Sequence, residues 1–195
     1  DVRAAHLAVR DGVGVIDQTS LAKFDITGPG ALAAAQWLSV ADMDKPVGTV
    51  IYTQLCNVRG GIECDLTMIR TAPDSFYVVT GSAFGAHDMG WIRTNSPDDG
   101  SVIVRDLTSA RAVVNVVGPK SRDVLQSVCE DDVSNEAFRY AKAREITIGS
   151  APVLAVRIGY VGELGWELHI PTEYAAHVYE LLHEAGQAHG IVDVG

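Results

Sequence analysis

Several chemical signatures are scarce or missing in this sequence of 195 residues. Basic residues are few, because 15 Lys and Arg stand against 25 Asp and Glu and give a formal net charge of −10. This balance argues against a nucleic-acid partner, since a phosphate backbone requires clustered Lys and Arg. No apolar run of about 18 residues is present, so no transmembrane helix is predicted. No secretory signal pattern opens the sequence, and we expect no membrane partner.

Cysteine is also scarce. Cys56, Cys64 and Cys129 form no CxxC motif and no cluster with histidine. Cys56 and Cys64 flank a turn, which allows them to lie on adjacent strands. We favour three reduced, buried thiols. We therefore expect a cytoplasmic protein, or one of the mitochondrial matrix in a eukaryotic cell.

Known catalytic and nucleotide-binding motifs are missing as well. The sequence contains no GxSxG, no P-loop and no GxGxxG motif. Without a dinucleotide-binding motif, these residues alone are not expected to bind FAD. The histidines are scattered and predict no metal site; they are His6, His87, His169, His177, His183 and His189.

The sequence has enough apolar residues to form a hydrophobic core, and its two halves repeat the same pattern of predicted elements. The chain is 47% hydrophobic, and its length suits one large domain or two small ones. Gly28-Pro29 and Gly118-Pro119 each follow an alternating or apolar strand and precede a helical pattern, and they lie 118 − 28 = 90 residues apart. In each case the proline lies close to a helix start, where its missing N–H is harmless.

The remaining patterns agree between the two halves. In the first half we predict a strand at 23–28, a helix at 31–38, a hairpin of strands 49–57 and 62–70, a strand at 76–80 and a helix at 84–93. In the second half we predict strands at 112–117, 145–148, 152–158 and 166–170, with helices at 122–128 and 172–188, the last capped by Thr172 and stopped at Gly190.

These patterns predict an α+β fold of two related units, each a mostly antiparallel sheet with packed helices. We place the units at residues 1–95 and 101–195, joined by a linker rich in Pro, Asp and Gly. The sequence ends soon after a helix, with an apolar run just begun. We therefore expect the second unit to be truncated at its C-terminal end and the chain to be a piece of a longer protein.

The most distinctive segment is residues 159–168, which reads GYVGELGWEL. Glycines at this spacing allow positive φ angles and close approach of a ligand or a strand. A glutamate can accept two N–H groups of an amino-bearing heterocycle, and a tyrosine can stack on its ring. Tyr160 and Glu167 are therefore candidate ligand-binding residues. A plain glycine-rich hairpin with exposed acids remains the alternative.

The first hairpin offers a second candidate group. Ile62, Cys64, Leu66 and Met68 should share one face of their strand, and Glu63, Asp65 and Thr67 the other. Aspartate is uncommon in strands, so an acid beside a Gly-Gly turn is a candidate for a cleft. Tyr52 lies on the partner strand. Ordinary surface roles, as a solvated carboxylate and a cross-strand aromatic, remain open for Asp65 and Tyr52.

These residues are also where the sequence resembles a known family. It is similar to the glycine cleavage T-protein (aminomethyltransferase) family, and most of all to the folate-binding C-terminal domain of dimethylglycine and sarcosine dehydrogenases. The stretches that carry the resemblance are 9–17, 24–29, 50–54, 60–67 (GGIECDLT) and 160–167 (YVGELGWE). Together they extend over nearly the whole chain.

The resemblance implies a tetrahydrofolate-binding fold and one-carbon chemistry that forms 5,10-methylenetetrahydrofolate from an amine-derived unit. It implies that Asp65 is the catalytic acid near the reactive folate nitrogens, that Tyr160 and Glu167 hold the pterin, and that Tyr52 lines the same cleft. T-proteins carry two acids in this hairpin, and the first is their key acid; here those places hold Cys64 and Asp65. The dehydrogenase-type relatives use the second place, which favours that branch.

The resemblance also frames the alternatives. The first is a non-catalytic folate-binding module, and the second is the folate domain or a structural piece of an FAD-dependent dehydrogenase. The family's later segment, which supplies an arginine and a C-terminal β domain, is not among these 195 residues. The expected partners are folate and a small methylated amine or aminomethyl donor, with FAD only in a protein that has an upstream oxidase domain.

Overall fold

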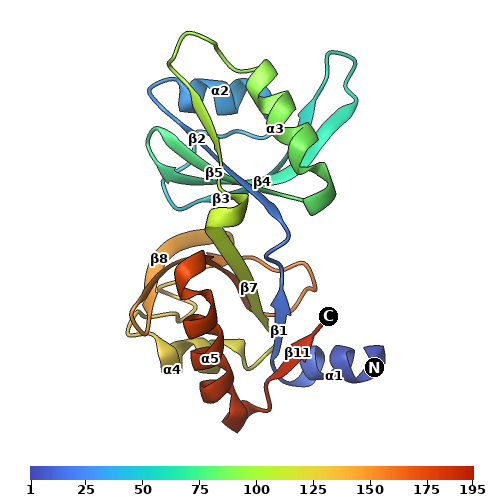
Figure 1. The fold of residues 1–195 in the computed structure, drawn as a ribbon, viewed down its shortest axis with the longest axis vertical. Helices are drawn as coiled ribbons and strands as arrows, with labels where there is room; N and C mark the ends of the chain where they lie inside the picture. Colours follow the sequence, from blue (N-terminus) through green and yellow to red (C-terminus); the bar gives the residue numbers. More distant parts are fainter. The chain divides into compact units, whose positions relative to one another are not determined.

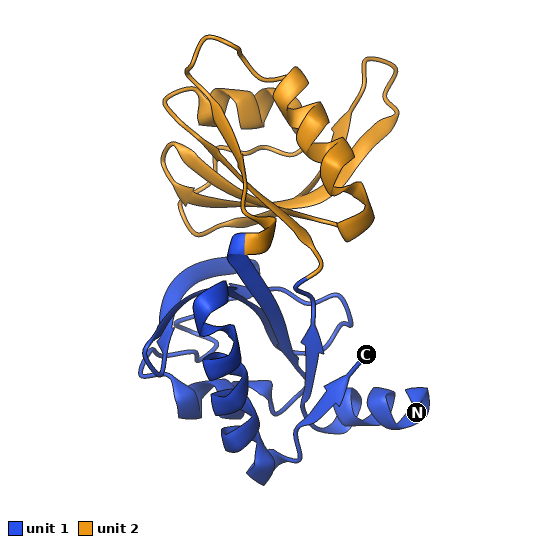
Figure 2. Ribbon diagram, in the orientation of Figure 1, with its two compact units in different colours: residues 1–19, 110–195 blue, residues 20–109 orange.

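The computed structural model describes all of residues 1–195 and contains five α-helices and eleven strands in two compact units. Unit 1 consists of Asp1–Thr19 and Ala110–Gly195, and unit 2 of Ser20–Ser109 (Figure 2). The α+β class and the mostly antiparallel sheets confirm the prediction from the sequence. No helix has both the length and the apolar character that a membrane span requires.

Unit 2 is a five-stranded antiparallel sheet with two helices on one face (Figure 1). The strands run in the order β3-β4-β5-β2-β6. The elements are β2 (Ala22–Thr27), α2 (Ala31–Leu38), β3 (Val50–Cys56), β4 (Ile62–Ala72), β5 (Ser75–Thr80), α3 (Gly85–Thr94) and β6 (Ile103–Asp106). The helix-covered face forms the core, with Phe24, Leu66 and Met68 fully buried. Ile62, at the start of β4, is exposed, whereas Cys64, two residues later, is buried.

Unit 1 is a six-stranded sheet in the order β11-β1-β7-β10-β9-β8, antiparallel except between β1 and β11. Helices α4 and α5 cover its core face. The elements are α1 (Val2–Asp11), β1 (Gly14–Asp17), β7 (Arg111–Val117), α4 (Ser121–Val128), β8 (Lys142–Ile148), β9 (Ala151–Arg157), β10 (Gly165–Pro171), α5 (Ala175–Gly186) and β11 (Val192–Val194).

The last helix starts later than the sequence predicts. Residues Thr172–Tyr174 form a tight 3₁₀ turn, and α5 itself begins at Ala175 without a side-chain cap, so Thr172 is not its N-cap. The predicted stop is confirmed, because Gly190 takes the left-handed conformation at φ +72°. Glycine suits such a position because it has no Cβ.

The two units repeat one topology, as the 90-residue spacing predicts. Both sheets contain three consecutive antiparallel strands, and the third of them lies beside the strand before the Gly-Pro step, in the patterns β3-β4-β5-β2 and β8-β9-β10-β7. The next strand of each sheet is exchanged along the sequence, because β1 precedes β2 but pairs with β7, and β6 precedes β7 but pairs with β2. This exchange is why Asp1–Thr19 packs with the second half, which differs from the contiguous division at residues 95–101.

The glycines of the two Gly-Pro steps have similar backbone conformations, and each is followed by an equivalent backbone hydrogen bond. Gly28 has φ +116° and Gly118 has φ +123°. Two residues later, the Gly30 N–H donates to the Ser101 carbonyl at 3.0 Å, and the Lys120 N–H donates to the Gly12 carbonyl at 3.1 Å. In both units the positive φ of this glycine allows the chain to lie close to the backbone that leads into the exchanged strand, which is β6 in unit 2 and β1 in unit 1.

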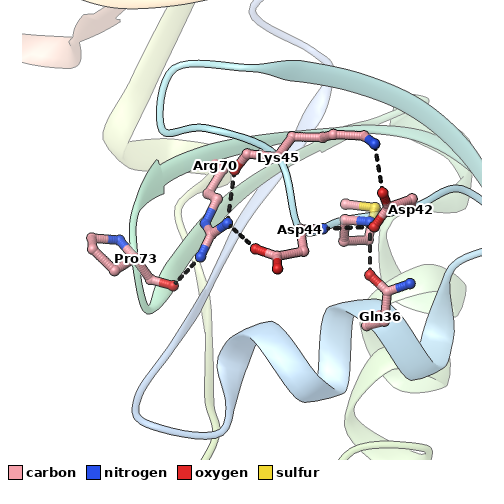
Figure 3. Close-up of polar contacts among 7 residues, drawn as sticks. Gln36, Asp42, Asp44, Lys45, Arg70 and Pro73 are labelled. Atoms are coloured by element: carbon pink, nitrogen blue, oxygen red, sulfur yellow. Dashed lines mark hydrogen bonds and ion pairs between the residues drawn. The ribbon is translucent and has the colours of Figure 1, made fainter.

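The loop after α2 is fastened to β4 through Arg70 (Figure 3). The Arg70 guanidinium donates to the Asp44 carboxylate at 2.7 Å, to the Lys45 carbonyl at 2.7 Å and to the Pro73 carbonyl at 3.0 Å. On the helix side, the Gln36 side chain accepts from a loop N–H at 2.8 Å. These bonds replace regular secondary structure in fixing the path of the loop.

Candidate functional site

The first pair of candidate residues lies on the open face of the unit 2 sheet, opposite the helices. Gln54 on β3 pairs with Asp65 on β4, and Tyr52 pairs with Thr67, so Tyr52 and Asp65 are diagonal neighbours. Such neighbours on one face have Cα atoms about 7–8 Å apart. Strand alternation and this register therefore place an aromatic ring and a carboxylate beside one another.

Asp65 is exposed and accepts a hydrogen bond of 3.0 Å from Gln54 Nε2. Its neighbour Cys64 points to the opposite, helix-covered face and is buried in the core. Only the second of the two hairpin positions therefore presents its side chain on the face that carries Tyr52. Tyr52 is itself exposed, which leaves its ring available to a ligand.

The second pair lies in unit 1, on the glycine-rich segment and the strand that follows it. Residues 158–164 form a loop between β9 and β10, as predicted. The Leu164 carbonyl accepts from the Gly118 N–H at 2.8 Å and from the Ser121 hydroxyl at 3.1 Å, and Glu163 forms an ion pair with Arg10. The loop base is thus fixed, and a cavity of about 390 Å³ beside it is lined mostly by residues of the loop, together with Tyr140 and Arg157.

Tyr160 stands at the exposed tip of this loop, with 95% of its surface accessible. It is not among the residues that line the 390 Å³ cavity. Gly162, two residues on, turns the chain back with φ +81°. The geometry offers the phenol ring to solvent, where it is free to stack on a flat molecule.

Glu167 lies on β10, on the face opposite the α4 and α5 core, and its side chain is only 16% exposed. It sits across the ladder from Asn115 on β7, and its carboxylate lies 3.5 Å from His169 Nε2. Asn115 is fully buried, and its Oδ1 atom has no hydrogen-bond partner in the protein. Two acceptor groups therefore face the same side of adjacent strands.

Asn115 is the residue that the sequence analysis missed. The 90-residue repeat offers a signal for it, because 115 − 25 = 90 and Asp25 occupies the equivalent place on β2. The Oδ1 atom of Asp25 is also buried without a hydrogen-bond partner. A buried polar oxygen without a hydrogen-bond partner thus occurs at the equivalent position of both units, and such atoms are uncommon in folded proteins.

Within unit 1, Glu167 and Asn115 supply acceptors suited to the N–H groups of a planar ligand, and the exposed Tyr160 supplies a stacking surface. Within unit 2, the exposed Tyr52 supplies a stacking surface. Asp65 supplies a carboxylate able to accept a proton.

Known proteins resemble the chain over its full length. The GCVT N-terminal domain model matches residues 1–195. Mouse mitochondrial sarcosine dehydrogenase is 36% identical over 203 residues, covering 97% of this chain and 22% of that protein. Mouse mitochondrial dimethylglycine dehydrogenase is 35% identical over 195 residues, covering 100% of this chain and 22% of that protein. The chain thus spans less than a quarter of either relative.

A solved structure shows the same fold. The glycine cleavage system aminomethyltransferase T from Bartonella henselae superposes with a TM-score of 0.86 at 24% identity, covering 100% of this chain and 51% of that chain. At this level of identity the likeness speaks for the fold, which the repeated α+β units already indicate. With the family model matched from end to end and two relatives above 30% identity, the chain belongs to the GCVT N-terminal domain family.

Proposed function

We propose that this chain is a tetrahydrofolate-binding, one-carbon transferase domain that forms 5,10-methylenetetrahydrofolate from an amine-derived one-carbon unit. Membership of the GCVT family and the likeness to aminomethyltransferase T support this class of activity. The observation that carries the proposal is the position of Asp65, alone of the two hairpin places, on the open face beside Tyr52. Tetrahydrofolate supplies the nucleophilic nitrogen atoms that accept the one-carbon unit.

Asp65 is assigned as the catalytic acid-base group. Its carboxylate orients the reactive nitrogen, takes the proton that this nitrogen loses on bond formation and stabilises positive charge nearby. Gln54 holds one carboxylate oxygen at 3.0 Å and leaves the other for this task. Tyr52 lines the same face. An acid in this role works best when bound substrate excludes water from it.

Glu167 and Tyr160 are assigned to the pterin. A reduced pterin presents an amino group and ring N–H groups along one edge, which suits the paired acceptors of Glu167 and Asn115. A buried acceptor without a partner is costly, and a ligand N–H would satisfy Asn115. Tyr160, free at the loop tip, would stack on the ring or donate a hydrogen bond.

The donor and the cellular setting follow from the named relatives. We propose a methylated amine or an aminomethyl group as donor, because the relatives are sarcosine and dimethylglycine dehydrogenases. FAD belongs to the proposal only as the cofactor of a larger flavoprotein that contains this chain, since the chain has no GxGxxG motif. We place it in the cytoplasm, or in the mitochondrial matrix of a eukaryotic cell, since the mouse relatives are mitochondrial.

The test separates binding from chemistry. The chain is titrated with tetrahydrofolate, and 5,10-methylenetetrahydrofolate is then measured with formaldehyde and with an aminomethyl donor. We expect saturable binding and product formation, with Asp65→Ala lowering the rate by about 100-fold or more while the fold is kept. Asp74→Asn, an exposed acid of the same unit, is the matched control and should leave the rate unchanged.

The outcomes are distinct. Folate binding without any product favours the non-catalytic binding module and rejects the transferase. Unchanged product formation in Asp65→Ala rejects the role of Asp65. No folate binding at all rejects the whole proposal.

A further inference from the structure

Three side chains of types that bind metals in other proteins lie close together at the end of the unit 2 sheet, where β4 extends past β5. Cys64 lies on β4, and His87 and Asp88 lie in the first turn of α3. One ligand atom of each lies within 4.8 Å of those of the other two. Cys64 and Asp88 are each 1% exposed, whereas the His87 side chain is 52% exposed. The Cys64–His87–Asp88 cluster therefore has a buried base and an accessible mouth.

The spacing suits one small cation. Three atoms no more than 4.8 Å apart always share a point within about 2.8 Å of each, and zinc bonds to S, N and O ligands measure about 2.0–2.3 Å. Each ligand atom therefore needs to move by less than about 0.8 Å to reach a zinc bond length. Side-chain rotation covers such a distance without a backbone shift.

Neighbouring side chains orient these ligands. Thr80 donates to Asp88 Oδ2 at 2.6 Å. His87 Nδ1 lies 3.0 Å from Asp88 Oδ1, while its Nε2 lies 3.6 Å from Glu63 Oε2. Glu63 in turn accepts from Asn57 at 2.7 Å. A histidine ligand of a metal usually turns its second nitrogen toward a carboxylate in this way, which fixes its ring and its tautomer.

The charges also favour a cation. The ion pairs of Asp88 and Glu63 involve His87 alone. A buried carboxylate without a strong positive partner is costly. A cysteine binds a metal as its thiolate, so binding at Cys64 would release the thiol proton.

We propose that the cluster binds a zinc-class divalent cation through Cys64 Sγ, His87 Nδ1 and the Asp88 carboxylate, with a fourth position open to water. Mixed sulfur, nitrogen and oxygen ligands select zinc and its neighbours, whereas magnesium and calcium prefer oxygen alone. The site is separate from the proposed folate chemistry, because Cys64 and Asp65 point to opposite faces of β4. The histidine and cysteine spacing in the sequence did not reveal it.

The test uses the full chain after treatment with a chelator. Zn²⁺ is titrated in competition with a chromogenic chelator, and Co²⁺ is added separately to detect the thiolate-to-cobalt absorption band in the near ultraviolet. We expect one zinc per chain, the release of at least one proton per zinc, and the thiolate band. Cys64→Ser should abolish the band and weaken zinc binding by at least about 100-fold, since even the outer partners of ligands matter by 10–100-fold.

Two further variants keep the test decisive. Cys129→Ser is the matched control, because Cys129 is also buried and burial raises the pKa of its thiol to about 11. It should bind zinc as the unmodified chain does. His87→Ala alters an exposed side chain, should stay folded by circular dichroism, and should also weaken zinc binding without changing folate turnover.

Three results would contradict the zinc site. Absence of stoichiometric zinc binding overturns the proposal. So does equal binding by Cys64→Ser and Cys129→Ser. If Cys64→Ser does not fold, unchanged zinc affinity in His87→Ala overturns it instead.

Discussion

Gly118 offers a stringent test of the repeated architecture. Its φ of +123° is a conformation that L side chains rarely adopt, and a Cβ atom there would lie 2.4 Å from the Gly12 carbonyl oxygen and 2.8 Å from that of Val9. Both oxygens belong to the backbone at the end of α1, which leads into the exchanged strand β1. Gly118→Ala should therefore loosen the attachment of this segment within unit 1.

The magnitude follows from two contributions. Holding a non-glycine residue in a sparsely populated conformation costs about 1–3 kcal/mol. The backbone clash adds to this, because a carbonyl cannot rotate away as a flexible side chain can. We expect a loss of about 3 kcal/mol in the free energy of unfolding, which for a chain of this size corresponds to a fall in Tm of about 6–12 °C.

Two other glycines are the controls. Gly60 also has positive φ, at +79°, but a Cβ there meets nothing within 4 Å, so Gly60→Ala should cost only about 1 kcal/mol. Gly90 lies inside α3 in open space, and Gly90→Ala should be neutral or stabilising. Thermal and urea unfolding are followed by circular dichroism. A Tm for Gly118→Ala equal to that of Gly60→Ala would refute the reasoning.

Three other predictions concern individual side chains. Burial raises the pKa of the Cys64 thiol to about 12, against 9.0 in the unfolded chain. The contribution of this thiol to the free energy of unfolding is therefore fully present below pH 9 and falls as the pH rises from 9 toward 12. Urea unfolding should show this fall, and Cys64→Ser should flatten it. Arg70→Met should lower the free energy of unfolding in urea by about 2 kcal/mol, because it breaks three hydrogen bonds of a largely buried guanidinium. Asp44→Ala, at an exposed carboxylate, should lower it by under about 1 kcal/mol. Equal losses for the two variants would contradict this. Asp88→Asn should lower the pKa of His87 in an NMR titration, since the Asp88 hydrogen bond is the main cause that raises it.

Local patterns in the sequence predict most of the fold. Strand alternation and the two Gly-Pro steps locate α2, α4 and the central strands to within a few residues. The exchange of β1 and β6 escapes such reasoning, because each strand has only four residues and nothing local says which sheet it joins. Strand pairing across about 100 residues, as between Ile16 and Asn115, is determined by tertiary packing and not by the local sequence.

The candidate site divides in the same way. A period of two residues predicts that Asp65 lies on the strand face opposite Cys64, and the structure places it there; that Tyr52 shares this face follows from the strand register, which the pattern does not give. Asn115 escaped because an isolated asparagine in an apolar strand gives no signal until the repeat aligns it with Asp25. The Cys64–His87–Asp88 cluster forms only when α3 packs against the end of β4, and sequence spacing carries no trace of that contact.

The proposed function assigns Asp65, Tyr52, Tyr160 and Glu167 to folate. A crystal structure of the chain with bound tetrahydrofolate tests this most directly. We predict the pterin ring against Tyr160 with its N–H edge on Glu167, and the Asp65 carboxylate within hydrogen-bond distance of a reactive folate nitrogen. Folate bound away from Glu167, or with its reactive nitrogens far from Asp65, would contradict the account.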